Sequence, residues 1–457
     1  MKARLAPLYL LSPDDPDFVG QTRRLRDLLA DEAEVADPLP LGAALPDVDA
    51  VVFPQMVGEA YRRSGEFRQL GLPILVLTSE FGTMAMWDWE IINYLKAEGV
   101  SLLAPYSFAG AVTACRALAA KRELRRGRFL VYQDNPGEGG FQPSIFNRFY
   151  WWQDECGERI REKFGLRIEK RSFKELGANA KAIPDAQARE DWDRLRDTVP
   201  LAEVSDRATL NAVKLYRAVR YELDEGEGAV GAGINCLNES AFSDTTPCLA
   251  WNLLYQERDL IWGCEGDTVS MLTKFIVHRS LRMPMVMSNL YPFLMGQAAL
   301  KHERIPEFPR VDDPENYVLA AHCGYLGVVP QSFATEWNLR RKVLAIVDDN
   351  ATAIDARLPV GDLTLSKLDP TFERLVIVEG ELRGYAGYPG SDCRNGAVIR
   401  VPDGHALMEG LPSHHSLLST GHDLPGFKLV GQVFGMQVEV LGGRIRTTDQ
   451  PGTRAAT

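Results

Sequence analysis

The chain lacks the sequence features that mark secreted, membrane-spanning and nucleic-acid-binding proteins. Its seven cysteines are odd in number, scattered and without any Cys-x-x-Cys pair, which argues against a disulfide framework or a structural zinc site and fits reduced thiols. No apolar run is long enough to cross a bilayer, and nothing at the N-terminus resembles a signal peptide. The net charge of -11 disfavours a nucleic-acid partner. We therefore expect a cytoplasmic protein with no membrane or nucleic-acid partner.

Nucleotide-binding signatures are also absent. No Gly-x-Gly-x-x-Gly follows the first predicted strand, so a dinucleotide site has no support. Residues 134–140 form a glycine-rich loop whose amides could cradle a phosphate. The loop lacks the Lys-Ser or Lys-Thr of a P-loop, and its Asp134 and Glu138 would repel an anion. An ordinary loop is the simpler interpretation.

The length of 457 residues exceeds one ordinary core and predicts several domains. Strands and helices alternate over 1–126 and again over 127–283, whereas short strands separated by turns dominate 284–457. The predicted fold class is α/β, with two consecutive Rossmann-like, doubly wound parallel-sheet domains followed by a mostly antiparallel β-barrel-like domain. The predicted strands are 8–11, 48–53, 73–78, 128–132, 229–234, 260–262, 284–287, 318–321, 343–347, 363–368, 375–378, 397–401 and 437–441. The predicted helices are 18–29, 59–70, 87–97, 108–124, 146–164, 208–223, 249–255, 267–276 and 423–434, with the basic run 121–126 as a solvated helix end.

The stretch from Leu260 to Ile276 organises the central domain. An apolar strand ends in Glu265, and a helical period begins at Asp267, a suitable N-cap for the first turn. In open α/β sheets, ligands bind at the carboxyl ends of strands, so Glu265 lies where a site is expected. An N-cap Asp beside an exposed loop Glu remains the simpler alternative.

Histidine is scarce, and several histidines are placed where they could join Glu265 in a ligand site. His322 ends an apolar run, His414 and His415 are adjacent in a polar stretch, and His422 follows closely. Single histidines are most often structural. Together with Glu265, however, they form an oxygen and imidazole set that Mn²⁺, Mg²⁺, Fe²⁺ or Co²⁺ accepts.

The order of these stretches resembles the family of L-fucose and L-arabinose isomerases, from about residue 128 to 441. Glu265-Gly-Asp267 before a helix is similar to the family's first metal-binding acid, and His322 in Ala-Ala-His-Cys-Gly to a histidine at the metal of the arabinose branch. The pair His414-His415 is similar to the late His-His pair, one of which is a ligand. The segment from Gly361 through Glu381 is similar to the barrel segment before that pair.

One position departs from the family pattern. After the strand 284–287 the family places a second acid at the metal, whereas this chain has Ser288 and Asn289. Asn289 can offer a carbonyl oxygen or a hydrogen bond to a sugar, but it cannot accept a proton as a base. Glu265 is then the positioned base, unless Asp267 or Glu239 takes part.

The resemblance implies an aldose–ketose isomerase that works through a metal-stabilised enediol, with Mn²⁺ as the expected ion. Glu265, Asn289, His322 and His415 are its expected ligands, and His322, His414, Asn289 and Trp87 its expected sugar contacts. Glu265 and Asp267 are the expected catalytic acids. The family also implies a homo-trimer or homo-hexamer. The alternative is a non-isomerising relative that binds a sugar or sugar acid, or uses the metal for another carbonyl reaction.

Overall fold

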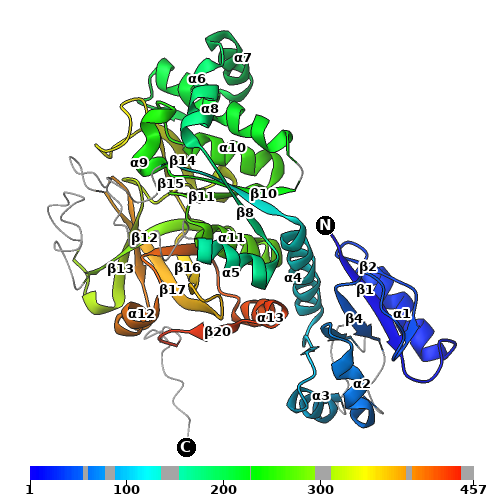
Figure 1. The fold of residues 1–457 in the computed structure, drawn as a ribbon. Coiled ribbons are helices and arrows are strands. Elements are labelled where there is room, and N and C mark those ends of the chain that lie inside the picture. Colours follow the sequence, from blue (N-terminus) through cyan, green and yellow to red (C-terminus); the bar gives the residue numbers. More distant parts are fainter. Residues whose placement is uncertain are drawn as a thin grey trace, which may run out of the picture.

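The computed structural model describes residues 1–54, 60–77, 88–134, 154–226, 228–293, 310–387 and 394–443. They form a mixed α/β architecture with parallel sheets and a closed antiparallel barrel (Figure 1). The predicted α/β class, with parallel sheets and an antiparallel barrel, is confirmed at this level. Across these ranges we find no helix whose length and apolar character would suit a bilayer span.

The first sheet is parallel throughout, with strand order β2-β1-β4-β5-β6 and β3 beside β1. Its first strand begins at Ala3 rather than at the predicted Leu8, because Ala3 and Leu5 enter the core while Leu11 is exposed. The strands are β1 (Ala3–Tyr9), β2 (Ala33–Val35), β3 (Leu39–Pro40), β4 (Ala50–Phe53), β5 (Ile74–Val76) and β6 (Leu102–Leu103). The helices are α1 (Pro16–Leu28), α2 (Ser64–Gln69), α3 (Asp88–Ala97) and α4 (Phe108–Arg126).

The second sheet is also parallel, with strand order β11-β10-β7-β8. Its strands are β7 (Arg128–Tyr132), β8 (Arg167–Arg171), β10 (Ala229–Ile234) and β11 (Ile261–Cys264). The helices of this region are α5 (Asp154–Phe164), α6 (Phe173–Ala182), α7 (Asp185–Leu195), α8 (Asp206–Asp224), α9 (Cys236–Glu239), α10 (Cys248–Arg258) and α11 (Thr268–Leu281). The glycine-rich loop beyond Asp134 and the first part of the predicted helix 146–164 lie outside the described residues.

Six antiparallel strands close the barrel in the order β16-β19-β12-β13-β18-β17, with β17 pairing back to β16. Closure removes the exposed strand edges that an open sheet would leave. The strands are β12 (Val286–Pro292), β13 (Tyr317–Ala321), β16 (Gly361–Leu368), β17 (Arg374–Ala386), β18 (Gly396–Arg400) and β19 (His415–Thr420). Around them lie α12 (Gly404–Gly410), α13 (Leu424–Phe434) and β20 (Gln437–Val440), which runs parallel to β17.

The barrel differs from the prediction at two strands that matter for the site. β12 continues to Pro292, so Ser288 and Asn289 lie within the strand and not after its end. β19 was not predicted, because its serines Ser416 and Ser419 are buried and its sequence does not alternate between apolar and polar residues.

The predicted strand 343–347 is wrong. This segment turns between β14 (Glu336–Arg341) and β15 (Thr352–Arg357), which pair with each other and, through β14, with β9 (Leu201–Ala202). Its apolar residues do not form a strand of a sheet. Val347 and Leu344 pack with Leu237 in a small separate core.

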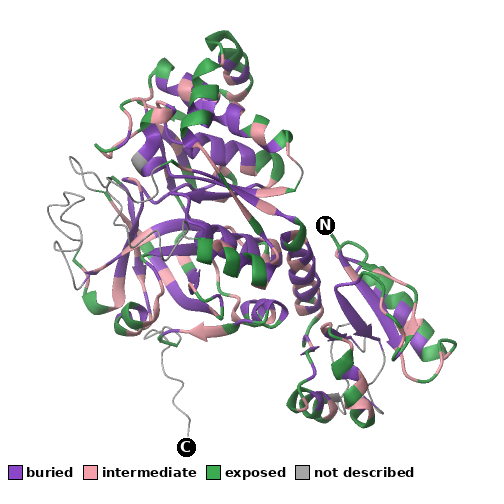
Figure 2. Ribbon diagram, viewed as in Figure 1, coloured by how far each residue is buried: buried purple, intermediate pink, exposed green. Residues whose placement is uncertain are grey.

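Helix α11 is the wall that the central sheet and the barrel share. It contacts β10 and β11 on one side and β16 and β19 on another, and Figure 2 shows it almost wholly buried. A helix enclosed on several sides needs apolar residues all round, which the run from Val269 to Val277 largely supplies. Gly263 permits the close approach, because a Cβ there would lie 2.5 Å from Met271. The N-terminus of α11 is thereby fixed at the junction of sheet and barrel.

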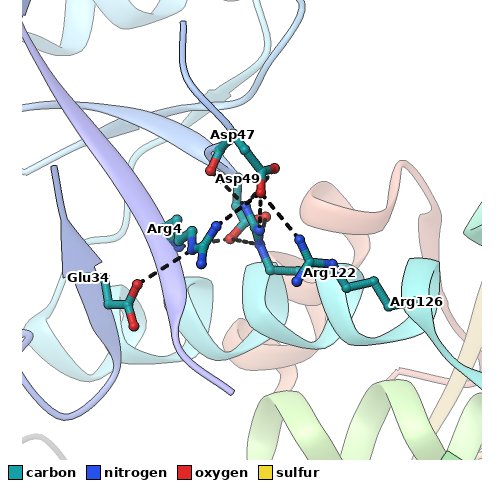
Figure 3. Close-up of polar contacts among 6 residues, drawn as sticks. All are labelled: Arg4, Glu34, Asp47, Asp49, Arg122 and Arg126. Carbon is teal, nitrogen blue, oxygen red and sulfur yellow. Dashed lines mark hydrogen bonds and ion pairs between the residues drawn. The ribbon is translucent and has the colours of Figure 1, made fainter. Parts of the chain in front are cut away.

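Helix α4 joins the first sheet to the rest of the chain (Figure 1), packing against β1 as well as α11 and α13. Arg122 lies on this helix with only 6% of its side chain exposed, and its Nε donates to both carboxylate oxygens of Asp49 at 2.8 and 3.0 Å. One of its terminal nitrogens donates to Asp47 at 2.8 Å (Figure 3). The expectation of a solvated helix end is therefore wrong for Arg122, and Lys121 also donates to the carbonyl of Val433.

Replacing Arg122 should destabilise the chain strongly. Arg122→Ala would leave the carboxylate of Asp49 buried without its cation, which typically costs about 3–5 kcal/mol in free energy of unfolding. Arg126 provides the matched control, because it lies one turn further along α4 and also pairs with Asp47, but with 56% of its side chain exposed. Arg126→Ala should change stability by less than about 1 kcal/mol. Urea denaturation compares the two, and equal losses would contradict the buried-pair account.

Candidate metal centre

Glu265 is presented by a tight left-handed turn between β11 and α11. Its φ is 56° and that of Gly266 is 70°. A positive φ is unfavourable for a residue with a side chain, and such conformations concentrate at functional sites. Asp267 then caps α11, its carboxylate accepting the amide of Ser270 at 2.8 Å, as the sequence predicted. The turn leaves the Glu265 side chain buried, with 8% of it exposed.

His322 is positioned by a second left-handed turn. It follows β13 and pairs with Tyr325 through two backbone hydrogen bonds of 2.7 and 3.1 Å. The two residues between them, Cys323 and Gly324, both have positive φ, the geometry of a tight type I′ hairpin. The side chain of His322 is 2% exposed, and its Nδ1 lies 2.9 Å from the thiol of Cys323, so Nε2 faces Glu265.

His415 is the first residue of β19 and is 1% exposed. In the barrel it lies opposite Asn289 of β12, and Asn289 lies opposite Ala321 of β13, the residue before His322. Strand pairing alone therefore brings Asn289 between the two histidine-bearing strands.

These elements bring one carboxylate and two imidazoles together. One donor atom from each of Glu265, His322 and His415 lies within 4.8 Å of the other two. The Nε2 of His322 is 3.4 Å from Oε1 of Glu265, and the Nε2 of His415 is 3.8 Å from its Oε2. All three residues belong to the predicted ligand set, although they are spread over 151 positions of the chain. The group could hold a metal ion.

Asp267 links this group to the protein interior. Fully buried, its carboxylate accepts the Nδ1–H of His415 at 2.9 Å, the hydroxyl of Ser270 at 2.7 Å and the ammonium of Lys367 at 3.0 Å. Because a carboxylate only accepts, His415 donates through Nδ1, and its Nε2 is directed towards Glu265. Lys367 is buried as well and donates to Ser270.

Burial and pairing fix the charges here. Burial alone would raise the pKa of Asp267, but Lys367, His415 and Ser270 together hold it far below its usual value. Burial lowers the pKa of His322 to about 4, although Glu265 opposes this effect. His322 is therefore a neutral imidazole at pH 7, the form that binds metals. Burial likewise lowers the pKa of Lys367, and Asp267 opposes that shift.

The other predicted site residues are placed as follows. His414 is exposed, and its ring centroid lies 4.2 Å from that of His415. His422 is directed elsewhere, since its Nε2 bonds the carbonyl of Gly380 at 2.8 Å. Glu239 is buried and accepts the amide of Asp134 at 2.9 Å. Trp87 lies outside the described residues.

Sequence reasoning missed Lys367. Its only local signal is a lone lysine in the otherwise uncharged run Leu363–Leu368. A lysine that is wholly buried is rare unless it is paired, so the partner had to be an acid elsewhere in the chain. Nothing local identifies Asp267 as that acid.

Lys367→Met should lower the free energy of unfolding by about 3–5 kcal/mol, because it leaves the buried Asp267 carboxylate without its cation. Lys274→Met is the matched control. Lys274 is equally buried but donates to the carbonyl of Trp262 at 2.9 Å, and burial lowers its pKa to about 7. Its replacement by Met should cost far less. Adding Asp267→Asn to Lys367→Met should restore part of the loss in urea denaturation, and an additive loss would contradict the pairing.

The chain was also compared with known proteins. No protein-family model matches it, and no curated protein matches it either.

Proposed function

We propose that the chain is a metal-dependent aldose–ketose isomerase that acts on an open-chain sugar. The observation that carries the proposal is the buried Glu265, His322 and His415 group at the junction of a parallel sheet and a barrel. A ligand set at the carboxyl end of a strand is where α/β folds bind small molecules. The order of motifs that resembles L-fucose and L-arabinose isomerases supplies the reaction class.

The residues present fit a divalent cation. The Nε2 of His322 and the Oδ1 of Asn289 are buried atoms without a hydrogen-bond partner among the described residues. Such atoms are costly unless a ligand satisfies them. Glu265, His322, His415 and Asn289 would hold the ion, and Mn²⁺ suits their oxygen and imidazole donors. When bound, it would polarise the carbonyl and stabilise negative charge on the two sugar oxygens.

Each side chain of the site would then have its own role in the reaction. Glu265 would move the proton between C1 and C2 of the sugar. Asp267 has three protein partners, which favours a positioning role for it over proton transfer: it orients His415 and keeps its Nε2 directed to the centre. His414 and Trp87 are proposed to contact the sugar.

The proposal also covers the domain division, the cellular compartment and the oligomeric state. We propose that 1–126 and 127–283 are Rossmann-like, doubly wound domains and that 284–457 is the barrel domain. We place the protein in the cytoplasm and expect a homo-trimer or homo-hexamer.

The presence of a single carboxylate at this centre favours a second function. The one carboxylate in the group is Glu265, since Asn289 stands where the resembling family has an acid and Asp267 is engaged by Lys367. A site with one base would bind a sugar or sugar acid without turnover, or catalyse another carbonyl reaction.

The direct test is isomerisation of aldoses. Purified protein with Mn²⁺ should convert at least one aldose of a panel into its ketose, and Glu265→Gln should abolish this activity. Added Mn²⁺ should raise the melting temperature and chelator should reverse the rise, because an ion that binds only the folded state stabilises it. A melting curve that neither treatment moves would refute the metal centre. Mn²⁺ stabilisation without ketose from any aldose would favour the second function.

Asn289→Asp should tighten Mn²⁺ binding, because it adds a negative ligand beside the two histidine-bearing strands. If the missing base limits turnover, activity should rise by about 10²–10⁴-fold. Calorimetry and ketose assays measure both effects, with Asn289→Ala as the variant that should weaken binding. Unchanged affinity in both variants would show that Asn289 does not face the ion.

A further inference from the structure

A row of polar residues crosses the carboxyl edge of the central sheet beside the candidate centre. Strands β11, β10 and β7 are neighbours, and their last residues Cys264, Ile234 and Tyr132 are in register. The residues that follow are therefore also neighbours: Glu265, Asn235 and Gln133. Only the first of these was recognised from the sequence.

Asn235 is the unusual member of this row. It is fully buried, yet neither its Oδ1 nor its Nδ2 has a hydrogen-bond partner within the described part of the chain. It precedes α9, but its side chain makes no capping hydrogen bond. Its backbone is firmly held, since its amide donates to the carbonyl of Tyr132 at 3.0 Å. Folding thus carries the cost of burying an amide that serves no structural contact.

Gln133 repeats the pattern one strand further on. Its Oε1 is buried without a hydrogen-bond partner among the described residues, while its backbone amide donates to the carbonyl of Arg171 at 2.8 Å. Two adjacent strands are therefore each followed by an amide residue whose backbone is hydrogen-bonded to the sheet and whose side chain has unused hydrogen-bonding capacity.

We propose that Asn235 and Gln133 bind the hydroxyl groups of a linear, uncharged polyol chain whose reacting end lies at Glu265, His322 and His415. A hydroxyl both donates and accepts, and so does a carboxamide, so each amide can satisfy one hydroxyl fully. This inference rests on the proposed function and adds to it the recognition of the substrate's non-reacting end.

The spacing of the row sets the size of the ligand. Neighbouring strands lie about 4.8 Å apart, so Asn235 is one strand spacing and Gln133 two strand spacings, about 10 Å, from the strand that ends at Glu265. A two- or three-carbon compound at the centre would not reach Gln133, whereas a five- or six-carbon chain extends along the row. A sugar acid is disfavoured, because a carboxylate beside Asn235 would find one donor group and a repelling oxygen.

Calorimetric titration of the full chain with ribitol and with glycerol, each with and without Mn²⁺, tests this. Asn235→Ala should weaken ribitol binding about tenfold, the value of roughly one hydrogen bond, and leave glycerol binding unchanged. Gln133→Ala should act in the same direction. The control is Ser280→Ala at the far end of α11, which removes a fully buried hydroxyl that, like the Asn235 amide, has no hydrogen-bond partner among the described residues. It should change neither ligand's affinity.

Thermal melting separates recognition from structure. Asn235→Ala should melt at the same temperature as the unchanged chain or higher, because it removes a buried group without a partner. A marked fall in melting temperature, failure to fold, or ribitol affinity equal to that of the unchanged chain would overturn the inference. A chain that binds no Mn²⁺ would refute the proposed metal centre, while ribitol binding that still depends on Asn235 would preserve the polyol site.

Discussion

The carboxylate of Asp267 is the interaction on which the candidate centre depends. It caps α11, accepts from His415 of the barrel and pairs with Lys367 of a neighbouring barrel strand. A fully buried charge is tolerated only when its partners compensate for lost hydration. The three contacts come from separate elements, so the carboxylate has this environment only when sheet, helix and barrel are packed together. Stability and the orientation of a candidate ligand therefore rest on the same atoms.

Some residues of the centre lie on paired strands, and others lie at turns with unfavourable backbone conformations. Asn289 and His415 lie within paired barrel strands, where neighbouring hydrogen bonds fix their positions. Glu265 lies within a left-handed turn and His322 directly before one, and such turns are less favourable and depend on their surroundings. Gly266 and Gly324 lower this cost, because glycine adopts a positive φ readily. Ordered strands and strained turns together bring the side chains of Glu265, His322 and His415 to one place, with Asn289 opposite His415 in the barrel.

The sequence was informative where a signal is local. The apolar strand before Glu265, the capping position of Asp267 and the Cys-Gly after His322 are all short patterns, and the α/β class and the antiparallel barrel follow from periodicity. Signals that depend on distant pairing were missed. β19 buries serines, Lys367 shows its role only beside Asp267, and an amide without a partner, as at Asn235, leaves no trace in the sequence. Only the structure shows that His415 is buried beside Glu265 while His414 is exposed.

The chain order of the barrel has a consequence for synthesis. β19 lies between β12 and β16, although more than 120 residues separate it from the first of these. Domains fold as the chain emerges from the ribosome, N-terminal part first. β12 and β16 then each keep one edge unpaired, and Glu265 and His322 lack His415, until β19 has been synthesised. A nascent chain truncated before His415 would therefore be unable to assemble the Glu265, His322 and His415 group, however well its parallel sheets had formed.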